Sequence, residues 1–146
     1  VPLVLDEYGY TFEWGKAKLL RDGRDVLIVS SGLLTMRALE AATALEADRV
    51  DVAVLHVPTI KPLDIETIAR EAARGGRLVV VAENHSLIGG LGEAIAAELL
   101  ARGIAPSKFR RIALPDAFLD AGALPTLHDR YGISTTAITA TIKSWL

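Results

Sequence analysis

A short polar stretch follows the most apolar run of the chain, and it holds the residue types that could do chemistry. Residues 78–82 are all apolar, and each of the next four residues carries a side chain that can form hydrogen bonds. A carboxylate, a carboxamide, an imidazole and a hydroxyl in a row could bind a ligand or transfer a proton. A glycine cluster follows. The predicted interface or ligand loop consists of Glu83, Asn84, His85, Ser86, Gly89, Gly90 and Gly92.

The apolar spacing on either side of this stretch predicts the elements that position it. An unbroken apolar run such as residues 78–82 is typical of a parallel strand that is buried on both faces. From Leu91 onward, apolar residues recur at helical spacing through Ile95 and Leu99. The pattern therefore predicts a strand, a polar loop over residues 83–86, and a helix. In an open parallel sheet such loops lie at the carboxyl ends of the strands, where ligands and partners usually bind.

The glycine cluster before this helix has two interpretations. Its backbone N–H groups and the positive end of the helix dipole could hold a phosphate. The dinucleotide fingerprint is incomplete, however, because Ile95 stands at the third glycine position and Glu93 places a negative charge where a phosphate would lie. We therefore favour the other interpretation, in which the glycines allow close approach of strand and helix or a subunit contact.

His85 is the histidine best placed for function. It could form hydrogen bonds or transfer a proton, or it could hold its loop neighbours in place. We expect His56 and His128 to be structural. Three separated histidines without a cysteine argue against a zinc site. The carboxylates that could act at the loop ends, unless they are merely solvated, are Asp6, Glu7, Glu83 and Asp116.

Composition indicates a globular domain and argues against several functional classes. The chain has 146 residues, 51% of them hydrophobic, and a formal net charge of −2. Such a small charge disfavours nucleic acid and anionic membrane as partners, since both require a basic face. The absence of cysteine excludes disulfides and thiolate nucleophiles, and is compatible with the cytoplasmic location that we expect. Neither a Walker motif nor a Gly-x-Ser-x-Gly nucleophile motif occurs.

Strands and helices are predicted to alternate along the chain. An Asp22-Gly23 turn between two extended runs predicts a hairpin, with its first strand antiparallel at the sheet edge. The alternation predicts a three-layer α/β sandwich around a mostly parallel five-stranded sheet with one antiparallel edge strand. Besides the central strand, the predicted strands cover residues 16–20, 25–30, 50–57 and 110–114. The predicted helices cover residues 35–46, 65–74, 91–102, 125–131 and 135–146, with Asp64 and Ser134 as N-caps.

The chain is long enough to bury an independent core, so we expect a single domain over residues 1–146. Residues 1–14 are expected to form an irregular lead-in. The first residue is Val1, followed by Pro2, and not a methionine. This start indicates either processing or, as we favour, a fragment of a longer chain or a split subunit.

Four separated motifs resemble the C-terminal domain of transketolase-like proteins, in the same order and spacing over nearly the whole chain. The motifs are residues 12–17, 25–32, 58–64 and 83–92, and residues 131–133 resemble the near-terminal element of that family. The similarity is greatest to the C-terminal section of split transketolases, and the Glu-Asn-His-Ser loop favours that choice. The same domain closes 1-deoxyxylulose-5-phosphate synthase and the β subunit of 2-oxo acid dehydrogenase E1.

The resemblance implies a part in a thiamine-diphosphate-dependent transferase that moves two-carbon ketol units between sugar phosphates. In that family, thiamine diphosphate and Mg²⁺ lie between two other domains, and this chain has no Gly-Asp-Gly motif and only one asparagine, Asn84. We therefore expect no catalytic, cofactor-binding or metal-binding residue here, and an inactive isolated chain. Its implied role is to contact the thiamine-binding domains or subunit and to support a homo-oligomer, a dimer, of the full enzyme.

Two functions of other classes remain open. The chain could be the C-terminal domain of an E1 β-like subunit that docks a peripheral acyltransferase, which a pull-down with that acyltransferase would identify. It could also be a small free-standing module that binds an anion or a nucleotide. Calorimetry with phosphate ligands would identify the second of these.

Overall fold

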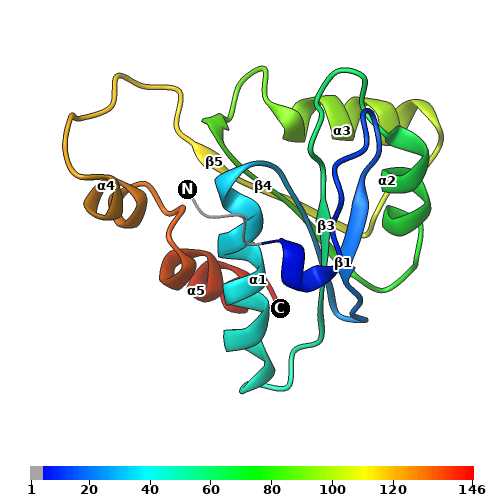
Figure 1. The fold of residues 1–146 in the computed structure, drawn as a ribbon, viewed down its shortest axis with the longest axis horizontal. Coiled ribbons are helices and arrows are strands. Elements are labelled where there is room, and N and C mark those ends of the chain that lie inside the picture. Colours follow the sequence, from blue (N-terminus) through cyan, green and yellow to red (C-terminus); the bar gives the residue numbers. More distant parts are fainter. Residues whose placement is uncertain (1–4) are drawn as a thin grey trace.

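The core of the protein is a five-stranded sheet between two layers of helices, seen in a computed structural model that describes residues 5–146 (Figure 1). The strand order is β1-β3-β2-β4-β5, with β2 to β5 parallel and β1 antiparallel to β3. The predicted three-layer α/β sandwich, with one antiparallel edge strand, is confirmed. The strands are β1 (Lys18–Arg21), β2 (Val26–Ser30), β3 (Val52–His56), β4 (Leu78–Ser86) and β5 (Lys108–Leu114).

Two helices cover each face of the sheet (Figure 1). Helices α1 (Leu33–Glu46) and α5 (Thr135–Trp145) lie on one face, and α2 (Ile65–Ala72) and α3 (Leu91–Ala101) lie on the other. A 3₁₀ helix, η1 (Asp6–Tyr8), belongs to the predicted lead-in, of which residues 1–4 lie outside the described part. Helix α4 (Leu124–Arg130) follows a long segment after β5. None of the described helices is long and apolar enough to cross a membrane.

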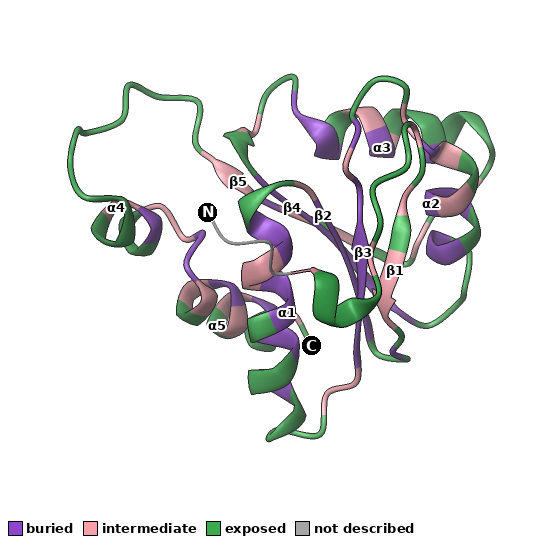
Figure 2. Cartoon of the chain, in the orientation of Figure 1, coloured by how far each residue is buried: buried purple, intermediate pink, exposed green. Residues whose placement is uncertain are grey.

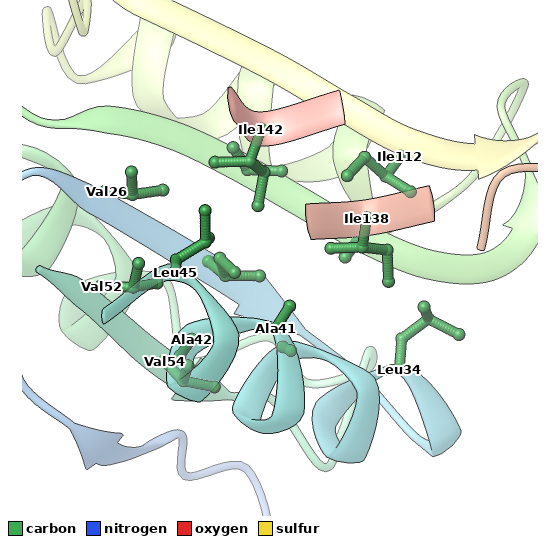
Figure 3. Close-up of a cluster of buried hydrophobic side chains, with 14 of the residues drawn as sticks. Val26, Leu34, Ala41, Ala42, Leu45, Val52, Val54, Ile112, Ile138 and Ile142 are labelled. Carbon is green, nitrogen blue, oxygen red and sulfur yellow. The ribbon is translucent and has the colours of Figure 1, made fainter. Parts of the chain in front are cut away.

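The central strands are buried on both faces because their side chains alternate between the two helical layers. In β2, Val26 and Ile28 belong to the cluster under α1 and α5, whereas Leu27 and Val29 belong to the cluster under α2 and α3. Figure 3 shows the first cluster, in which Ile138 of α5 and the α1 side chains lie over the sheet. Figure 2 shows the same burial along the strands.

The predicted hairpin between the first two strands is wrong, although the first strand is an antiparallel edge strand as expected. Strand β1 pairs with β3, not with β2. Strand β2 pairs with the parallel strands β3 and β4, one on each edge. Every side chain of β2 is buried, and only a strand at the centre of the sheet is covered by helices on both faces. Gly23 instead passes so close to β3 that a side chain there would collide with the backbone of Val52.

Strand β4 continues beyond its predicted end, and residues 83–86 belong to the strand and not to a loop. Ser86 pairs with Leu114 of β5, and the amide of Leu87 donates to the Leu114 carbonyl oxygen at 2.8 Å. A shift of register separates this pair from the regular pairing that ends at Ala82. Polar side chains do not end the strand, because pairing with β5 resumes at Ser86 after this shift. Asn84 and His85 reach the surface, whereas Glu83 is still buried.

The two predicted N-caps are confirmed. The Asp64 carboxylate accepts a hydrogen bond from the Thr67 amide at 3.2 Å, and the Ser134 hydroxyl accepts one from the Ala137 amide at 3.1 Å. Asp64 also accepts from the Ala17 amide at 2.9 Å, which ties the start of β1 to α2. Burial raises the pKa of Asp64, but the hydrogen bonds from Ala17 and Thr67 outweigh it and leave that pKa below its ordinary value.

Candidate functional site

The predicted loop residues lie at the carboxyl edge of the sheet, but strand alternation divides them between its two faces. Glu83 and His85 point to the side of α3, where they line a pocket of about 260 Å³. Asn84 points to the side of α1 and lines a different pocket. The structure therefore brings together only part of the predicted set. The first pocket is lined by Ile60, Glu83, His85, Gly89, Gly90 and Leu91.

Glu83 closes the amino terminus of α3. Its Oε2 atom accepts a hydrogen bond from the Leu91 amide at 2.7 Å, and its Oε1 atom accepts one from the Gly92 amide at 2.9 Å. The first amides of a helix have no acceptor within the helix, and the helix dipole favours a negative charge beside them. The buried Glu83 carboxylate therefore occupies the position where the glycine cluster could have held an anion.

The glycines make this contact possible. A Cβ on Gly90 would lie 2.5 Å from Glu83 Oε2, and a Cβ on Gly92 would lie 2.6 Å from Arg111 Cδ. Gly89 has a φ of +72°, and its amide donates to the Glu93 carboxylate at 2.9 Å. This geometry supports the interpretation that the cluster allows strand and helix to approach closely.

Arg111 belongs to this site and was not singled out from the sequence. Its Nη1 atom donates to the Leu87 carbonyl oxygen at 2.9 Å and lies 3.6 Å from Glu93 Oε1. Its aliphatic stem covers Gly92. Arg111 thus holds the turn between β4 and α3 from the neighbouring strand. The sequence offers only the pair Arg110-Arg111, and without knowing how β5 pairs it does not indicate which of the two faces the turn.

The His85 ring is exposed at the rim of the first pocket. Its Nδ1 atom lies 3.1 Å from the carbonyl oxygen of Ser86, and the Ser86 hydroxyl accepts a hydrogen bond from the Ile88 amide at 3.2 Å. No carboxylate in residues 5–146 bonds to this imidazole, so its one recorded protein partner is the Ser86 carbonyl oxygen, without an acidic group to support a general base. Its ring is available to a group from outside the described chain, and its functional role stays a prediction.

His56 lies at the same edge of the sheet but is buried. Its Nδ1 atom lies 2.7 Å from the Thr35 hydroxyl, which accepts a hydrogen bond from the Ser30 hydroxyl at 3.0 Å. The ring of Tyr10 packs edge-on against the imidazole with centroids 5.0 Å apart. Burial lowers the pKa of His56. The cluster ties the ends of β2 and β3 to the start of α1, which agrees with the structural role expected for His56.

The Asn84 pocket lies between the end of β5 and helix α4 and has a volume of about 190 Å³. We call it the α4 pocket. His128 is buried in its wall, and the Nδ1 atom of this ring has no hydrogen-bond partner within the described residues. The α4 pocket is lined by Asn84, Leu114, Leu119, Asp120, Leu124, Leu127, His128, Tyr131 and Ile133.

The other predicted carboxylates do not join the site. Asp6 and Glu7 are exposed in η1, and Asp116 is exposed in the segment after β5. Glu83 is the one buried member of the predicted set. The structure therefore assembles no pair of these carboxylates for acid–base chemistry.

Comparison with known proteins identifies the family. Residues 15–138 match the family model "Transketolase, C-terminal domain". The chain belongs to this family. The predicted resemblance is thus confirmed, and the transketolase C-terminal domain matches over most of the length of the chain.

The relatives of this transketolase C-terminal domain are longer proteins. The chain is 72% identical over 146 residues to a transketolase family protein of Sinorhizobium fredii, of which it covers 42%. It is 40% identical over 134 residues, 92% of its length, to the 6-deoxy-6-sulfo-D-fructose transketolase subunit of Clostridium sp. (strain MSTE9), of which it covers 41%. A solved split-gene transketolase, an inactive β4 tetramer, matches with a TM-score of 0.82 and 34% identity, over 93% of this chain and 44% of that one. The chain therefore spans less than half the length of these relatives.

The residues of this transketolase C-terminal domain do not fit the thiamine diphosphate and Mg²⁺ that the family resemblance implies. No group of three His, Cys, Asp or Glu side chains in the described part of the chain lies close enough to hold a metal ion. The helix amino terminus at the carboxyl edge already holds the Glu83 carboxylate, whose charge would repel a pyrophosphate.

Proposed function

We propose that this chain is the C-terminal domain of a thiamine-diphosphate-dependent transketolase, in which it supports assembly and not the transfer of two-carbon ketol units between sugar phosphates. One observation carries this proposal. At the edge of the sheet where ligands usually bind, Glu83 fills the amino terminus of α3 with a carboxylate of the protein itself. In this proposal, residues 1–146 form one domain of a longer chain or of a split subunit, and the isolated domain is inactive.

Exposed apolar side chains around the same edge supply a contact surface. Ile60 lines the pocket of His85, and Gly15 lies against Pro62 of the loop that carries Ile60. Trp14, which precedes Gly15 in the chain, is 68% exposed, and Ile88, which precedes Gly89 of the same pocket, is 56% exposed. We call Trp14, Ile60 and Ile88 the edge ridge. Because exposed apolar groups that gather in one place mark interaction sites, we assign the ridge to contact with the thiamine-binding domains or subunit.

The cofactor belongs to those other domains in this proposal. Thiamine diphosphate and Mg²⁺ would supply the carbanion chemistry of ketol transfer there. Two facts support the division: Glu83 occupies the helix terminus of this domain, and the relatives contain more than half of their length outside the matched part. We further propose that the assembled enzyme is a cytoplasmic homo-oligomer, a dimer or a multiple of one, and the β4 tetramer of the split-gene relative supports self-association.

Reconstitution tests the proposal. The chain is mixed with a thiamine-binding subunit of the same enzyme, and ketol transfer is measured with each component alone and with both. We expect turnover only from the mixture. Replacing Trp14 and Ile60 by serine should weaken reconstitution by at least about tenfold, since buried apolar anchors dominate protein interfaces. The matched control is Leu100→Ser, because Leu100 is 71% exposed on α3, away from the ridge. Full turnover by the thiamine-binding subunit alone, or by this chain alone, would contradict the proposal.

The role of His85 is tested separately in the complete enzyme. We propose that His85, with Asn84, Ser86 and the adjoining glycine turn, is presented at the interface with the other domains. His85→Ala is compared with His85→Gln, which keeps a hydrogen-bonding side chain. We expect His85→Ala to lower turnover, cofactor affinity or oligomer stability, and His85→Gln to lower them less. If all three are unchanged in His85→Ala, the functional interpretation of His85 is wrong.

A further inference from the structure

Residues 87–90 form the turn that joins β4 to α3 at the carboxyl edge of the sheet (Figure 1), and this turn carries Ile88 of the edge ridge. The Ile88 side chain is more than half exposed, but the backbone around it is held. The Ile88 amide donates to the Ser86 hydroxyl at 3.2 Å. The next amide, that of Gly89, donates to Oε2 of Glu93 at 2.9 Å. An exposed apolar side chain on a fixed turn is already ordered for a contact, so binding loses little freedom there.

Arg111 joins the two ends of this turn from the neighbouring strand β5. Its Nη1 atom donates at 2.9 Å to the carbonyl oxygen of Leu87, the residue before Ile88. The same atom lies 3.6 Å from Oε1 of Glu93, the carboxylate that accepts from the residue after Ile88. Only 29% of the Arg111 side chain is exposed, so solvent screens these contacts less than those of a fully exposed pair. One guanidinium group therefore fixes the backbone on both sides of Ile88.

Arg110, the neighbour of Arg111 in β5, takes no part in holding the turn. Phe109 packs in the cluster under α2 and α3, and side chains alternate along a strand, so Arg111 lies on the side of α3 and Arg110 on the opposite side. Within residues 5–146 the Arg110 guanidinium donates to the Phe109 carbonyl oxygen at 3.1 Å and to no atom of the turn. The two arginines thus form a matched pair, of which one contacts the turn.

We propose that Arg111 is a positioning residue of the edge ridge, which holds Ile88 in place for contact with the thiamine-binding part of the enzyme. This inference rests on the proposed function, in which the ridge makes that contact. Without the guanidinium the turn is free to move, and assembly must order it again. Ordering about one residue weakens assembly about tenfold. The rate of the assembled enzyme does not change, because Arg111 acts through Ile88 and not on the coenzyme.

The reconstitution assay of the proposed function tests this role. The concentration of the chain that gives half-maximal ketol transfer is measured together with turnover at saturation, after circular dichroism has shown that each variant is folded. Arg111→Met keeps an aliphatic stem over Gly92 but removes the donor, so it should raise the half-maximal concentration about tenfold and leave turnover at saturation unchanged. Arg111→Lys keeps a cation beside Glu93 and should recover part of the loss. Arg110→Met is the matched control and should behave as the wild type.

A double variant separates positioning from a general loss of stability. Ile88→Ser removes the side chain that Arg111 holds in place, and it should itself raise the half-maximal concentration. In the Ile88→Ser background, Arg111→Met should add less than about twofold, because both changes remove one contact. A purely structural role of Arg111 would weaken assembly equally in both backgrounds, and that result would overturn the proposal.

Failure of this inference is distinguishable from failure of the proposed function. The reference is the variant with Trp14 and Ile60 replaced by serine. If that variant weakens reconstitution while Arg111→Met has no effect, lowers turnover at saturation or is matched by Arg110→Met, the positioning role is wrong and the proposed function stands. If that variant also has no effect, the assignment of the edge ridge fails, and this inference fails with it.

Discussion

Glu83 on β4 and Gly90 at the start of α3 are fitted to each other, since a methyl group on Gly90 would lie 2.5 Å from Glu83 Oε2. Gly90→Ala should displace the carboxylate from the Leu91 and Gly92 amides and lower the free energy of unfolding by about 2–3 kcal/mol. Urea denaturation measures the change. The control is Gly75→Ala, because no atom lies within 4 Å of a Cβ at that position. Equal stability of Gly90→Ala and the wild type would show that Glu83 is not held by this fit.

Removing the carboxylate should have a similar effect by another route. Glu83→Ala leaves two buried helix amides without an acceptor, and we expect it to cost about 2–3 kcal/mol of unfolding free energy. Glu93→Ala, at the exposed side of the same turn, should cost less than about 1 kcal/mol. In the double variant, Gly90→Ala should add little to Glu83→Ala, because both remove one interaction. Fully additive costs would contradict this coupling.

His56 should make the protein sensitive to acid. Burial lowers the pKa of His56 in the folded chain, so the unfolded chain binds more protons once the pH falls below about 6.5, the ordinary histidine value. This contribution to stability is complete above that pH and is lost progressively as the pH falls toward the lowered pKa. His56→Gln should therefore reduce the slope of unfolding free energy between about pH 7 and pH 5. The exposed His85→Gln variant is the control, and an equal change of slope in both would contradict the assignment.

Arg77 should matter more to stability than its neighbour Arg74. Arg77 is buried, with Nη2 3.1 Å from Glu71 Oε2 and Nη1 donating to the Gly23 carbonyl oxygen at 3.2 Å. Arg77→Met leaves the Glu71 carboxylate buried with a weaker partner, and we expect a loss of about 3 kcal/mol. Arg74→Met removes the ion pairs of an exposed side chain to Asp22 and Glu71 but leaves Arg77 on Glu71, so it should cost clearly less. Chemical denaturation of both variants measures the difference, and equal costs would rule out a special role for burial.

The layers of the fold could be predicted because they follow from the spacing of apolar residues. The run at residues 78–82 and the periodicity from Leu91 onward leave few alternatives to a buried strand followed by a helix. The hairpin prediction failed because an Asp22-Gly23 turn is a local signal, whereas strand pairing depends on the whole sheet. Strand β2 is buried on both faces at the centre of the sheet, so β1 pairs with β3 instead. The end of β4 was misplaced because pairing with Leu114, and not side-chain polarity, decides it.

The site could be predicted only in part. The sequence indicated that Glu83 and the glycines lie near one another, but not that the carboxylate points back at the amides of its own helix, because that depends on the turn between them. Arg111 and the α4 pocket are formed by residues far apart in the chain, which β5 and α4 bring beside β4. Their contribution could not be identified from spacing along one segment.

The central claim is that the carboxyl edge of the sheet contacts other parts of the enzyme and does not bind the coenzyme. Measuring cofactor binding by this domain tests that claim most directly. Residues 1–146, shown to be folded by circular dichroism, and the complete enzyme are each titrated with thiamine diphosphate and Mg²⁺ in a calorimeter. We expect binding by the complete enzyme and none by the domain alone up to about millimolar ligand. Mg²⁺-dependent micromolar binding by the domain alone would contradict the account.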